Sequence, residues 1–259
     1  MTREPDHAER AAFDEIANAY DLHRPTYPHQ LFSDLVALTG IDDRSRALEV
    51  GTGPGKATRG LARRGISILG LEPGQKLAAV ARTNLQSFSQ VEIITTSFES
   101  WPPEREAFAL VYSAQAFHWV APEVRFVKAW EALRKGGWLA IFANVPRRGE
   151  SELDRAIDAC YQECAPSHRA TGMERRDVME SQFLSCPLFQ TLPVRRYDWS
   201  TAYSAEKYVA LLGTYSDHQT LPEAERVALF GGISAAIKAH GGTLELGYET
   251  KLLLGMRLG

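Results

Sequence analysis

Short apolar runs alternate with segments of helical pattern over the first 145 residues of the chain. The apolar runs predict strands at 47–50, 66–71, 91–95, 109–112 and 138–142. Helices are expected between them at 56–64, 75–86 and 123–133, with Gly136-Gly137 as the cap of the last one. Strands that alternate with helices predict an α/β fold, in which helices cover both faces of a parallel sheet.

The pattern changes on either side of this region. Before it, the helical spacing of Phe13, Ile16, Ala17 and Tyr20 predicts a helix at 6–20, and another is expected at 29–39. After Val145, the expected elements are two polar helices within 151–186, a strand at 191–199, helices at 204–212 and 222–240, and a last strand at 250–257. We expect one domain over 1–259, with an N-terminal helical lid at 1–40. A helical insertion at 145–188 would contribute to the substrate site.

The composition narrows the class of protein. The chain has 259 residues and a formal net charge of −3 at pH 7, which suits one large α/β domain. Its arginine pairs, such as Arg147-Arg148 and Arg175-Arg176, are isolated and indicate solvated surface, which argues against a nucleic-acid partner. The polar N-terminus is no signal peptide, and no apolar run reaches the ~18 residues of a spanning helix. We expect a cytoplasmic monomer or homodimer without a membrane partner.

Three cysteines, Cys160, Cys164 and Cys186, do not form a disulfide framework. Cys160 and Cys164 lie one helical turn apart and could be half of a metal site, but no matching Cys or His pair lies nearby in the sequence. We therefore expect ordinary thiols and no bound metal.

The first strand runs directly into a glycine loop, Glu-Val-Gly-Thr-Gly-Pro-Gly at 49–55. A strand, a glycine turn and a helix open a nucleotide-binding α/β unit, because glycine adopts positive φ and leaves room for a ligand. A dinucleotide fingerprint, G-x-G-x-x-G, would place its third glycine at Lys56. The G-x-G-x-G spacing instead favours an uncharged or cationic nucleoside. Glu49 would suit an ammonium or sulfonium, or it ties down the loop backbone, or both.

Ligands of a doubly wound sheet lie outside the carboxyl ends of its strands. The residues after the first four strands should therefore face one crevice, and they are 49–55, Glu72-Pro73, 97–99 and 113–119. Glu72 ends the second strand about 20 residues after the glycine loop, where an acid accepts hydrogen bonds from ribose hydroxyls. The alternative for Glu72 is an exposed carboxylate at a strand end.

These segments together resemble the class I S-adenosylmethionine-dependent methyltransferases. The resemblance rests on the glycine loop, on Glu72, on Ser-Phe-Glu at 97–99 before Trp101-Pro102, and on Ser-Ala-Gln-Ala-Phe-His-Trp at 113–119. Tyr20 and the Arg-Pro-Thr-Tyr-Pro segment at 24–28 are similar to a small-molecule subgroup, the type 11 or trans-aconitate methyltransferase-like proteins. The resemblance covers roughly 13–142. It implies a Rossmann-like, seven-stranded sheet of order 3-2-1-4-5-7-6, with the last strand antiparallel and a helical cap.

The resemblance also implies which residues hold the cofactor, S-adenosylmethionine. Gly51, Thr52 and Gly53 would line its methionine portion, with Glu49 beside them. Glu72 and Pro73 would hold the ribose, and Ser97 and Phe98 would meet the adenine. Ala114 and Gln115 would lie along the sulfonium side. Tyr20 and Arg24 would close over the cofactor. Two residues depart from the family pattern: Thr52 replaces a frequent cysteine or alanine, and Ser97 replaces an aspartate that often contacts the adenine amine.

Methyl transfer from a sulfonium is an in-line displacement, for which the protein mainly supplies proximity and alignment. It requires neither a metal nor a covalent nucleophile, and a base helps only when the acceptor atom carries a proton. His118 is the candidate base, because an imidazole titrates near neutrality; alternatively, it is a structural histidine beside Phe117 and Trp119. The expected substrate pocket consists of Tyr27, His118, Trp119 and Tyr215.

The sequence thus predicts an S-adenosylmethionine-dependent methyltransferase (EC 2.1.1.-) that acts on an O, N or C atom of a small molecule. Two alternatives remain open. Tyr203 and Lys207 form a Tyr-x-x-x-Lys pair like that of NAD(P)-dependent short-chain oxidoreductases, although the glycine spacing differs from theirs. The second alternative is a non-catalytic nucleoside-binding module.

Overall fold

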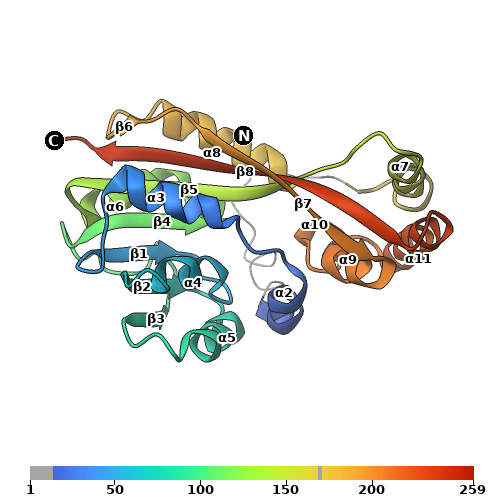
Figure 1. The fold of residues 1–259 in the computed structure, drawn as a ribbon, viewed down its shortest axis with the longest axis horizontal. Helices are drawn as coiled ribbons and strands as arrows, with labels where there is room; N and C mark the ends of the chain where they lie inside the picture. The colour runs from blue at the N-terminus through green and yellow to red at the C-terminus, as the bar shows by residue number, and fades with distance from the viewer. Residues whose placement is uncertain (1–13, 169–170) are drawn as a thin grey trace.

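The computed structural model describes residues 14–168 and 171–259, and shows a sheet with helices on both faces and a further group of helices at one end (Figure 1). The predicted helix at 6–20 falls partly outside the described residues, Phe13 included, and α2 spans Ala17–His23. Helix α3, His29–Thr39, has its predicted bounds. Within the described part of the chain, no helix combines the length and the hydrophobicity needed to cross a bilayer.

The described residues form one sheet of eight strands. The strands are β1 Arg46–Val50, β2 Ser67–Glu72, β3 Val91–Thr95, β4 Phe108–Ala114, β5 Leu133–Arg147, β6 Phe189–Thr191, β7 Arg195–Ser204 and β8 Thr243–Arg257. Their order is β3-β2-β1-β4-β5-β8-β6, and β7 also pairs with β8. Strands β1 to β5 are parallel, whereas β8 is antiparallel to β5.

The predicted strand order is confirmed, but the predicted sixth strand is interrupted. Both β6 and β7 pair with β8, so together they take the place of the single strand expected at 191–199. Thr191 lies opposite Gly255 and Arg195 lies opposite Leu252, so the register shifts by one residue between them. Pro193 lies at this break, and it has no N–H with which to continue the ladder.

Helices cover the two faces of the sheet and bury separate cores. On one face lie α3 and α4, Lys56–Ala62; on the other lie α6, Pro122–Ala132, and α8, Thr171–Leu184. Successive residues of β1 enter the two cores: Ala47 packs on the α3 side and Leu48 on the α6 side, as the two-residue period of a strand requires. Helix α5, Gln75–Leu85, packs beside β2 and β3.

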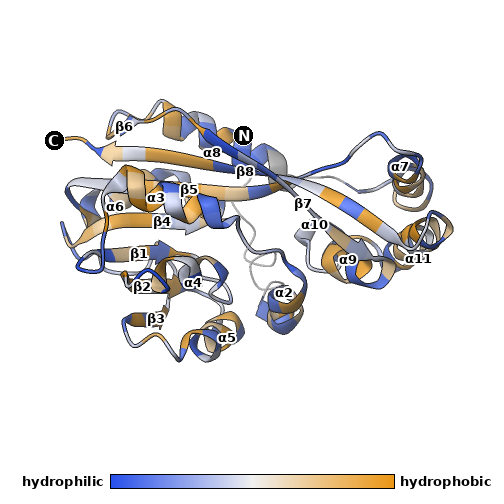
Figure 2. Ribbon diagram, in the orientation of Figure 1, coloured by the Kyte–Doolittle hydropathy of each residue, from blue (hydrophilic) through white to orange (hydrophobic). Residues whose placement is uncertain are grey.

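A third core lies at the end of the sheet where β7 and β8 extend beyond the other strands (Figure 1). Helices α7, Glu152–Cys164, α9, Ala205–Leu212, and α11, Glu223–Ala239, pack there against Leu244, Leu246 and Tyr248 of β8. Hydrophobic residues are visible on α9 and α11 in this group (Figure 2). The long β7–β8 pair therefore carries a helical unit beside the cavity that is described below.

The glycine pair at 136–137 does not cap α6, contrary to the prediction. Helix α6 ends at Ala132, and β5 begins at the next residue. Leu133 pairs with Phe108 and Trp138 with Leu110, so five steps along β5 correspond to two along β4. Gly136, with a φ of 69°, lies within this bulge, where a positive φ turns the chain.

Candidate functional site

The glycine loop joins β1 to α4 through a backbone shape that L side chains rarely adopt. Gly51, Gly53 and Gly55 have φ values of 74°, 57° and 88°. Gly51 also lies against the segment after β4, because a Cβ placed on it would come 2.3 Å from the Cβ of Ala116. The loop therefore requires glycine for its conformation, and at Gly51 for its packing as well.

Hydrogen bonds hold this loop against the end of β2. The N–H groups of Gly51 and Thr52 donate to the carbonyl oxygen of Leu71, at 2.9 and 3.1 Å. The N–H of Gly53 donates to Oε2 of Glu72 at 2.7 Å. Strands β1 and β2 and the glycine loop therefore form one fixed edge of the site.

Glu72 lies where its strand position predicts, at the end of β2 and facing the loop. Its Oε1 accepts a second backbone hydrogen bond, from the N–H of Gly74 at 2.9 Å. The side chain is buried, and this burial raises the pKa of its carboxyl, while the two backbone hydrogen bonds lower it. Glu72 is therefore part of a closed, hydrogen-bonded corner, unlike the exposed carboxylate of the alternative interpretation.

A cavity of about 960 Å³ opens beside the loop at the carboxyl ends of the parallel strands. The predicted binding residues that line it are Tyr20, Arg24, Tyr27, Gly51, Thr52, Gly53, Glu72, Pro73, Ser97, Phe98, Ala114, Gln115, His118, Trp119 and Tyr215. Its volume lies within the range of ligand pockets, roughly 300–1,000 Å³. The fold thus brings together the four segments after β1 to β4, as expected for this sheet topology.

Glu49 is the predicted binding residue that does not line the cavity. It is fully buried behind the wall, where its Oε2 accepts hydrogen bonds from Oγ1 of Thr58 (2.5 Å) and from the hydroxyl of Tyr112 (2.9 Å). Burial raises the pKa of its carboxyl to about 8, although both hydrogen bonds lower it. Glu49 is therefore largely protonated at pH 7. Its hydrogen bonds join β1 to α4 and β4. It does not make the direct contact with a cationic ligand that was one of the expectations for it.

Arg24 closes one side of the cavity. Its Nη2 donates to the carbonyl oxygen of Thr214 at 2.7 Å, just before α10, Ser216–Gln219. Its guanidinium lies 3.9 Å from the ring centre of Tyr215 and 5.0 Å from that of Tyr20. Arg24 therefore links the N-terminal helix to the helices beyond the sheet, across the space that the cavity occupies.

Gln115, at the end of β4, has a strained backbone. Its φ of 62° is uncommon for a residue other than glycine. Its N–H donates to the carbonyl oxygen of Phe142, and its Nε2 donates to that of Asn144, both at 3.0 Å. Its Oε1 lies 3.4 Å from Nη1 of Arg176 on α8. Strand β5 thus holds the strained residue while its side chain reaches the helix above the cavity.

His118 lies on η1, Phe117–Trp119, and is partly buried. Burial, together with the positive charges of Arg176, Arg175 and Arg125, lowers the pKa of His118 well below its usual value. The guanidinium of Arg175 also lies 4.8 Å from the ring centre of Trp119. His118 is thus a neutral imidazole at pH 7 in surroundings that favour an anion.

Comparison with known proteins agrees with this geometry. Residues 48–141, which include the glycine loop and Glu72, match the model of a methyltransferase domain. The chain contains a class I S-adenosylmethionine-dependent methyltransferase domain. The expected cofactor and enzyme class are thereby confirmed for the domain, and neither the oxidoreductase nor the non-catalytic alternative is favoured.

Relatives of the methyltransferase domain occur in bacteria. An uncharacterised methyltransferase and a trans-aconitate 2-methyltransferase of Mycobacterium tuberculosis are each 29% identical to the chain, over 133 and 148 residues. These matches cover 51% and 56% of the chain, which spans about half the length (52%) of each relative. The solved structure of a putative type II methyltransferase from Anaeromyxobacter dehalogenans shares the fold, with a TM-score of 0.67 at 24% identity, over 90% of this chain and 97% of that one.

The cavity of the methyltransferase domain extends beyond the predicted residues. Its far side is lined by Arg148, His168, Arg176, Tyr208, Asp217, His218 and Tyr248, among others. Arg148 and Arg176 belong to the arginine pairs that were expected on the solvated surface. Arg148 is exposed, as expected, although it also borders the cavity, whereas Arg176 is partly buried and lines it. Arg148 directly follows the carboxyl end of β5, a signal that could have identified it. Arg176 lies within α8, where no sequence feature marks it.

Replacing Glu72 with glutamine is expected to weaken the affinity for S-adenosylmethionine ~10-fold, or ~1.4 kcal/mol. The amide of glutamine has one acceptor oxygen where the carboxylate has two, so the corner that Glu72 forms with Gly53 and Gly74 loses one hydrogen bond. Isothermal titration calorimetry measures this change. The control is Glu92→Gln on the exposed side of β3, which removes the same charge away from the cavity. If Glu72→Gln and Glu92→Gln bind S-adenosylmethionine equally well, Glu72 is not part of the binding site.

Proposed function

We propose that this chain transfers the methyl group of S-adenosylmethionine to a small anionic molecule, with a carboxylate oxygen as the favoured acceptor. The observation that carries the proposal is the set of arginines on the far side of the cavity. Arg148 and Arg176 both line it. A guanidinium presents a planar set of donors that matches a carboxylate, which is why arginine is typical of carboxylate sites.

The proposed cofactor contacts lie on the opposite side of the cavity. Gly53 and its neighbours would lie against the methionine portion, since the loop backbone is exposed there without side chains. Glu72 would accept the ribose hydroxyls, because a carboxylate has about four lone-pair positions and backbone N–H groups occupy two. Phe98 is 3% exposed and would meet the adenine mainly through its backbone. The remaining proposed contacts are Tyr20, Arg24, Gly51, Thr52, Pro73, Ser97, Ala114 and Gln115.

The proposed chemistry demands little of the side chains. When bound, S-adenosylmethionine supplies a methyl group that its sulfonium already activates. The cavity walls would hold the acceptor in line and exclude water, which is the main contribution that a protein makes to such a displacement. A carboxylate is already ionised at neutral pH, so no residue has to remove a proton from it. We propose that neutral His118 positions the acceptor beside Trp119. If the acceptor atom carried a proton instead, His118 would have to act as the base that removes it.

The match with trans-aconitate 2-methyltransferase supports this acceptor class, because the compound in its name carries carboxylates. That match covers 56% of the present chain. The same relation supports a small molecule as the substrate. Arginine side chains inside a cavity of about 960 Å³ are consistent with both inferences.

We also propose that 1–40 acts as a lid and 145–188 as an insertion over the acceptor, within one domain. Asp14 Oδ1 accepts a hydrogen bond from the N–H of Lys76 at 2.7 Å, which fastens the described start of the lid to α5. Lys56 Nζ donates to the carbonyl oxygen of Asp21 at 2.6 Å, which fastens α2 to α4. On this proposal, the cofactor reaches the glycine loop when these contacts open.

Calorimetry and an acceptor panel test the proposed function together. We expect S-adenosylmethionine to bind and NADP⁺ not to bind. Among polycarboxylates, alcohols and amines, we expect the polycarboxylates to be methylated fastest. Arg176→Gln should lower kcat/KM for them ~10-fold, since a hydrogen bond to a charged group contributes about 1.5–3 kcal/mol. Its affinity for S-adenosylmethionine should not change.

The matched control is Arg134→Gln, which removes an exposed arginine from the β5 bulge, away from the cavity. It should leave both kcat/KM and cofactor affinity unchanged. Binding of NADP⁺ without S-adenosylmethionine would contradict the methyl-transfer proposal as a whole. Preferential methylation of uncharged acceptors, with Arg176→Gln as active as the wild type, would contradict only the carboxylate preference.

A further inference from the structure

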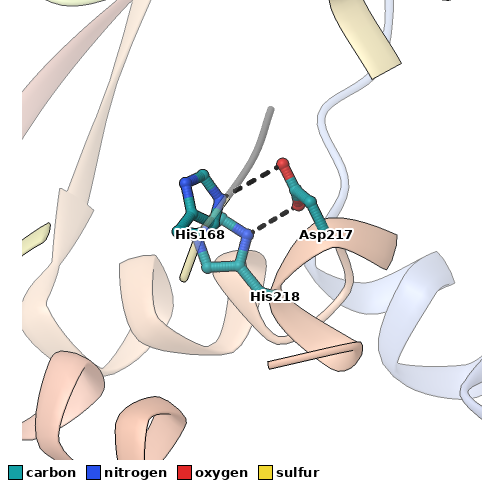
Figure 3. Close-up of side chains that lie close together, drawn as sticks. All are labelled: His168, Asp217 and His218. Atoms are coloured by element: carbon teal, nitrogen blue, oxygen red, sulfur yellow. Dashed lines mark hydrogen bonds and ion pairs between the residues drawn. The ribbon is translucent and has the colours of Figure 1, made fainter. Parts of the chain in front are cut away.

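Three side chains that offer metal ligands meet on the far side of the cavity (Figure 3). His168 follows α7, and Asp217 and His218 belong to α10. One potential ligand atom of each lies within 4.8 Å of the others, and the described residues contain no other such group of three. The carboxylate of Asp217 faces both rings, with Oδ1 2.7 Å from Nδ1 of His218 and Oδ2 3.4 Å from Nε2 of His168.

The cluster is partly shielded from solvent. His218 is 4% exposed, and the side chains of His168 and Asp217 are 17% and 21% exposed.

The side chain of Tyr161 on α7 contacts both imidazoles. Its hydroxyl oxygen lies 2.8 Å from Nε2 of His218, and its ring centre lies 5.0 Å from that of His168. Metal-binding histidines almost always direct their second ring nitrogen to an oxygen acceptor, which fixes the orientation of the ring and its tautomer. For His218, the hydroxyl of Tyr161 takes this place. The cluster thus has the outer contact that a metal site needs in addition to its ligands.

Two imidazoles and one carboxylate select among metal ions. Mg²⁺ and Ca²⁺ prefer sites made of oxygen ligands alone. Imidazole suits zinc, iron, copper and nickel, and the combination of two histidines and a carboxylate is found in catalytic sites that bind such ions. Three protein ligands also leave coordination positions for water or for an atom of another molecule.

We propose that His168, Asp217 and His218 bind one divalent transition-metal ion of the zinc type, with its open coordination positions on the cavity that they line. This site goes beyond the proposed methyl transfer and does not depend on which acceptor is methylated. It also departs from the metal-free chain expected from the sequence. On binding, a tautomer shift would place the proton of His218 on Nε2, from which it donates a hydrogen bond to the hydroxyl oxygen of Tyr161, so Nδ1 is left free for the metal and the ring stays neutral.

The test is a titration of the full chain, stripped of metal with a chelator, with Co²⁺. Visible absorption should show ligand-field bands at one Co²⁺ per chain, without the strong near-ultraviolet band of a Co²⁺–thiolate bond. The near-ultraviolet band distinguishes binding at this cluster from binding at Cys160 and Cys164, because only the cysteines would form a Co²⁺–thiolate bond. Zn²⁺ should displace Co²⁺, whereas Mg²⁺ should not. The absence of ligand-field bands at millimolar Co²⁺, or a thiolate band in their place, would overturn the proposal.

Variants assign the ligands. His168→Gln and Asp217→Asn should each weaken Co²⁺ affinity ~100-fold or more, and Tyr161→Phe ~10-fold, the lower end of what loss of such an outer contact costs. His240→Gln, at an exposed histidine that follows α11, is the matched control and should bind Co²⁺ as the wild type does. Circular dichroism shows whether each variant is folded. Wild-type affinity in folded His168→Gln, or an equal loss in His240→Gln, would overturn the assignment.

Discussion

Gly53→Ala is expected to weaken the affinity for S-adenosylmethionine at least ~100-fold, or ~2.7 kcal/mol, while the domain stays folded. Gly53 lines the cavity, and a Cβ placed on it meets no protein atom within 4 Å. The added methyl group would therefore occupy space that the ligand needs. Its φ of 57° adds backbone strain of roughly 1–2 kcal/mol, which lowers the stability of the fold. Calorimetry and thermal unfolding measure the two effects separately.

Gly40→Ala separates the strain from the steric effect. Gly40 ends α3 with a φ of 67°, and a Cβ on it also meets nothing within 4 Å, but it does not line the cavity. Both variants should lose similar stability, and only Gly53→Ala should lose cofactor affinity. If the two variants bind the cofactor equally well, the glycine loop is not the cofactor contact.

Glu49→Gln is expected to make the domain more stable than the wild type above pH 8 and about equally stable near pH 4.5. Glutamine has the shape of the protonated carboxyl and keeps an oxygen for Thr58 and Tyr112. The other oxygen of Glu49, Oε1, is buried and has no hydrogen-bond partner among the described residues. Loss of the proton therefore places an incompletely solvated charge in the core, which the variant avoids.

The direction of this pH effect on stability follows from the linkage between proton binding and folding. The pKa of Glu49 is about 8 in the folded chain, against 4.5 for a glutamate in an unfolded chain, so the folded state binds this proton more tightly. The stabilisation is complete below pH 4.5 and is lost as the pH rises through 8. At about 1.4 kcal/mol per pKa unit, the difference between the two stability curves should reach the order of 4 kcal/mol.

Urea unfolding of both proteins between pH 4.5 and 9 measures this difference, with Glu92→Gln as the exposed control. Groups that do not interact with Glu49, such as His118, contribute equally to both curves and cancel, whereas the nearby carboxylate of Glu72 is one of the causes that raise the pKa of Glu49. Parallel curves for the wild type and Glu49→Gln would contradict a raised pKa. In that case, Glu49 would be charged at pH 7, and the interpretation that its carboxylate attracts a sulfonium would apply again.

The glycine loop and Glu72 could be predicted because their positions depend on local constraints. The loop is a turn between neighbouring elements, and its spacing alone excludes the dinucleotide pattern. Glu72 ends the strand beside it, and parallel strands put their carboxyl ends at one edge. The same reasoning predicted the sheet order. It could not predict the break at Pro193, where one proline changes the pairing register.

The role of Glu49 was beyond local reasoning. Its place in the glycine loop motif is compatible with a side chain on either face of β1. Only the packing of Thr58 and Tyr112 around it shows that the carboxyl points into the core, where burial changes its charge. A formal charge read from a sequence therefore overstated its electrostatic effect on a ligand.

By itself, the sequence determined the α/β class, the strand order, the methyltransferase family with its cofactor, and nearly all of the residues after β1 to β4 that line the cavity. These depend on short-range spacing that the backbone converts directly into position. The tertiary structure decided the other side, where Arg148, Arg176 and the His168–Asp217–His218 cluster converge from α7, α8, α10 and the end of β5. These residues lie far apart in the chain, and no periodicity links them. The long β7–β8 pair carries the helical unit beside the cavity, whereas α8 brings Arg176 to the cavity from the α6 face of the sheet.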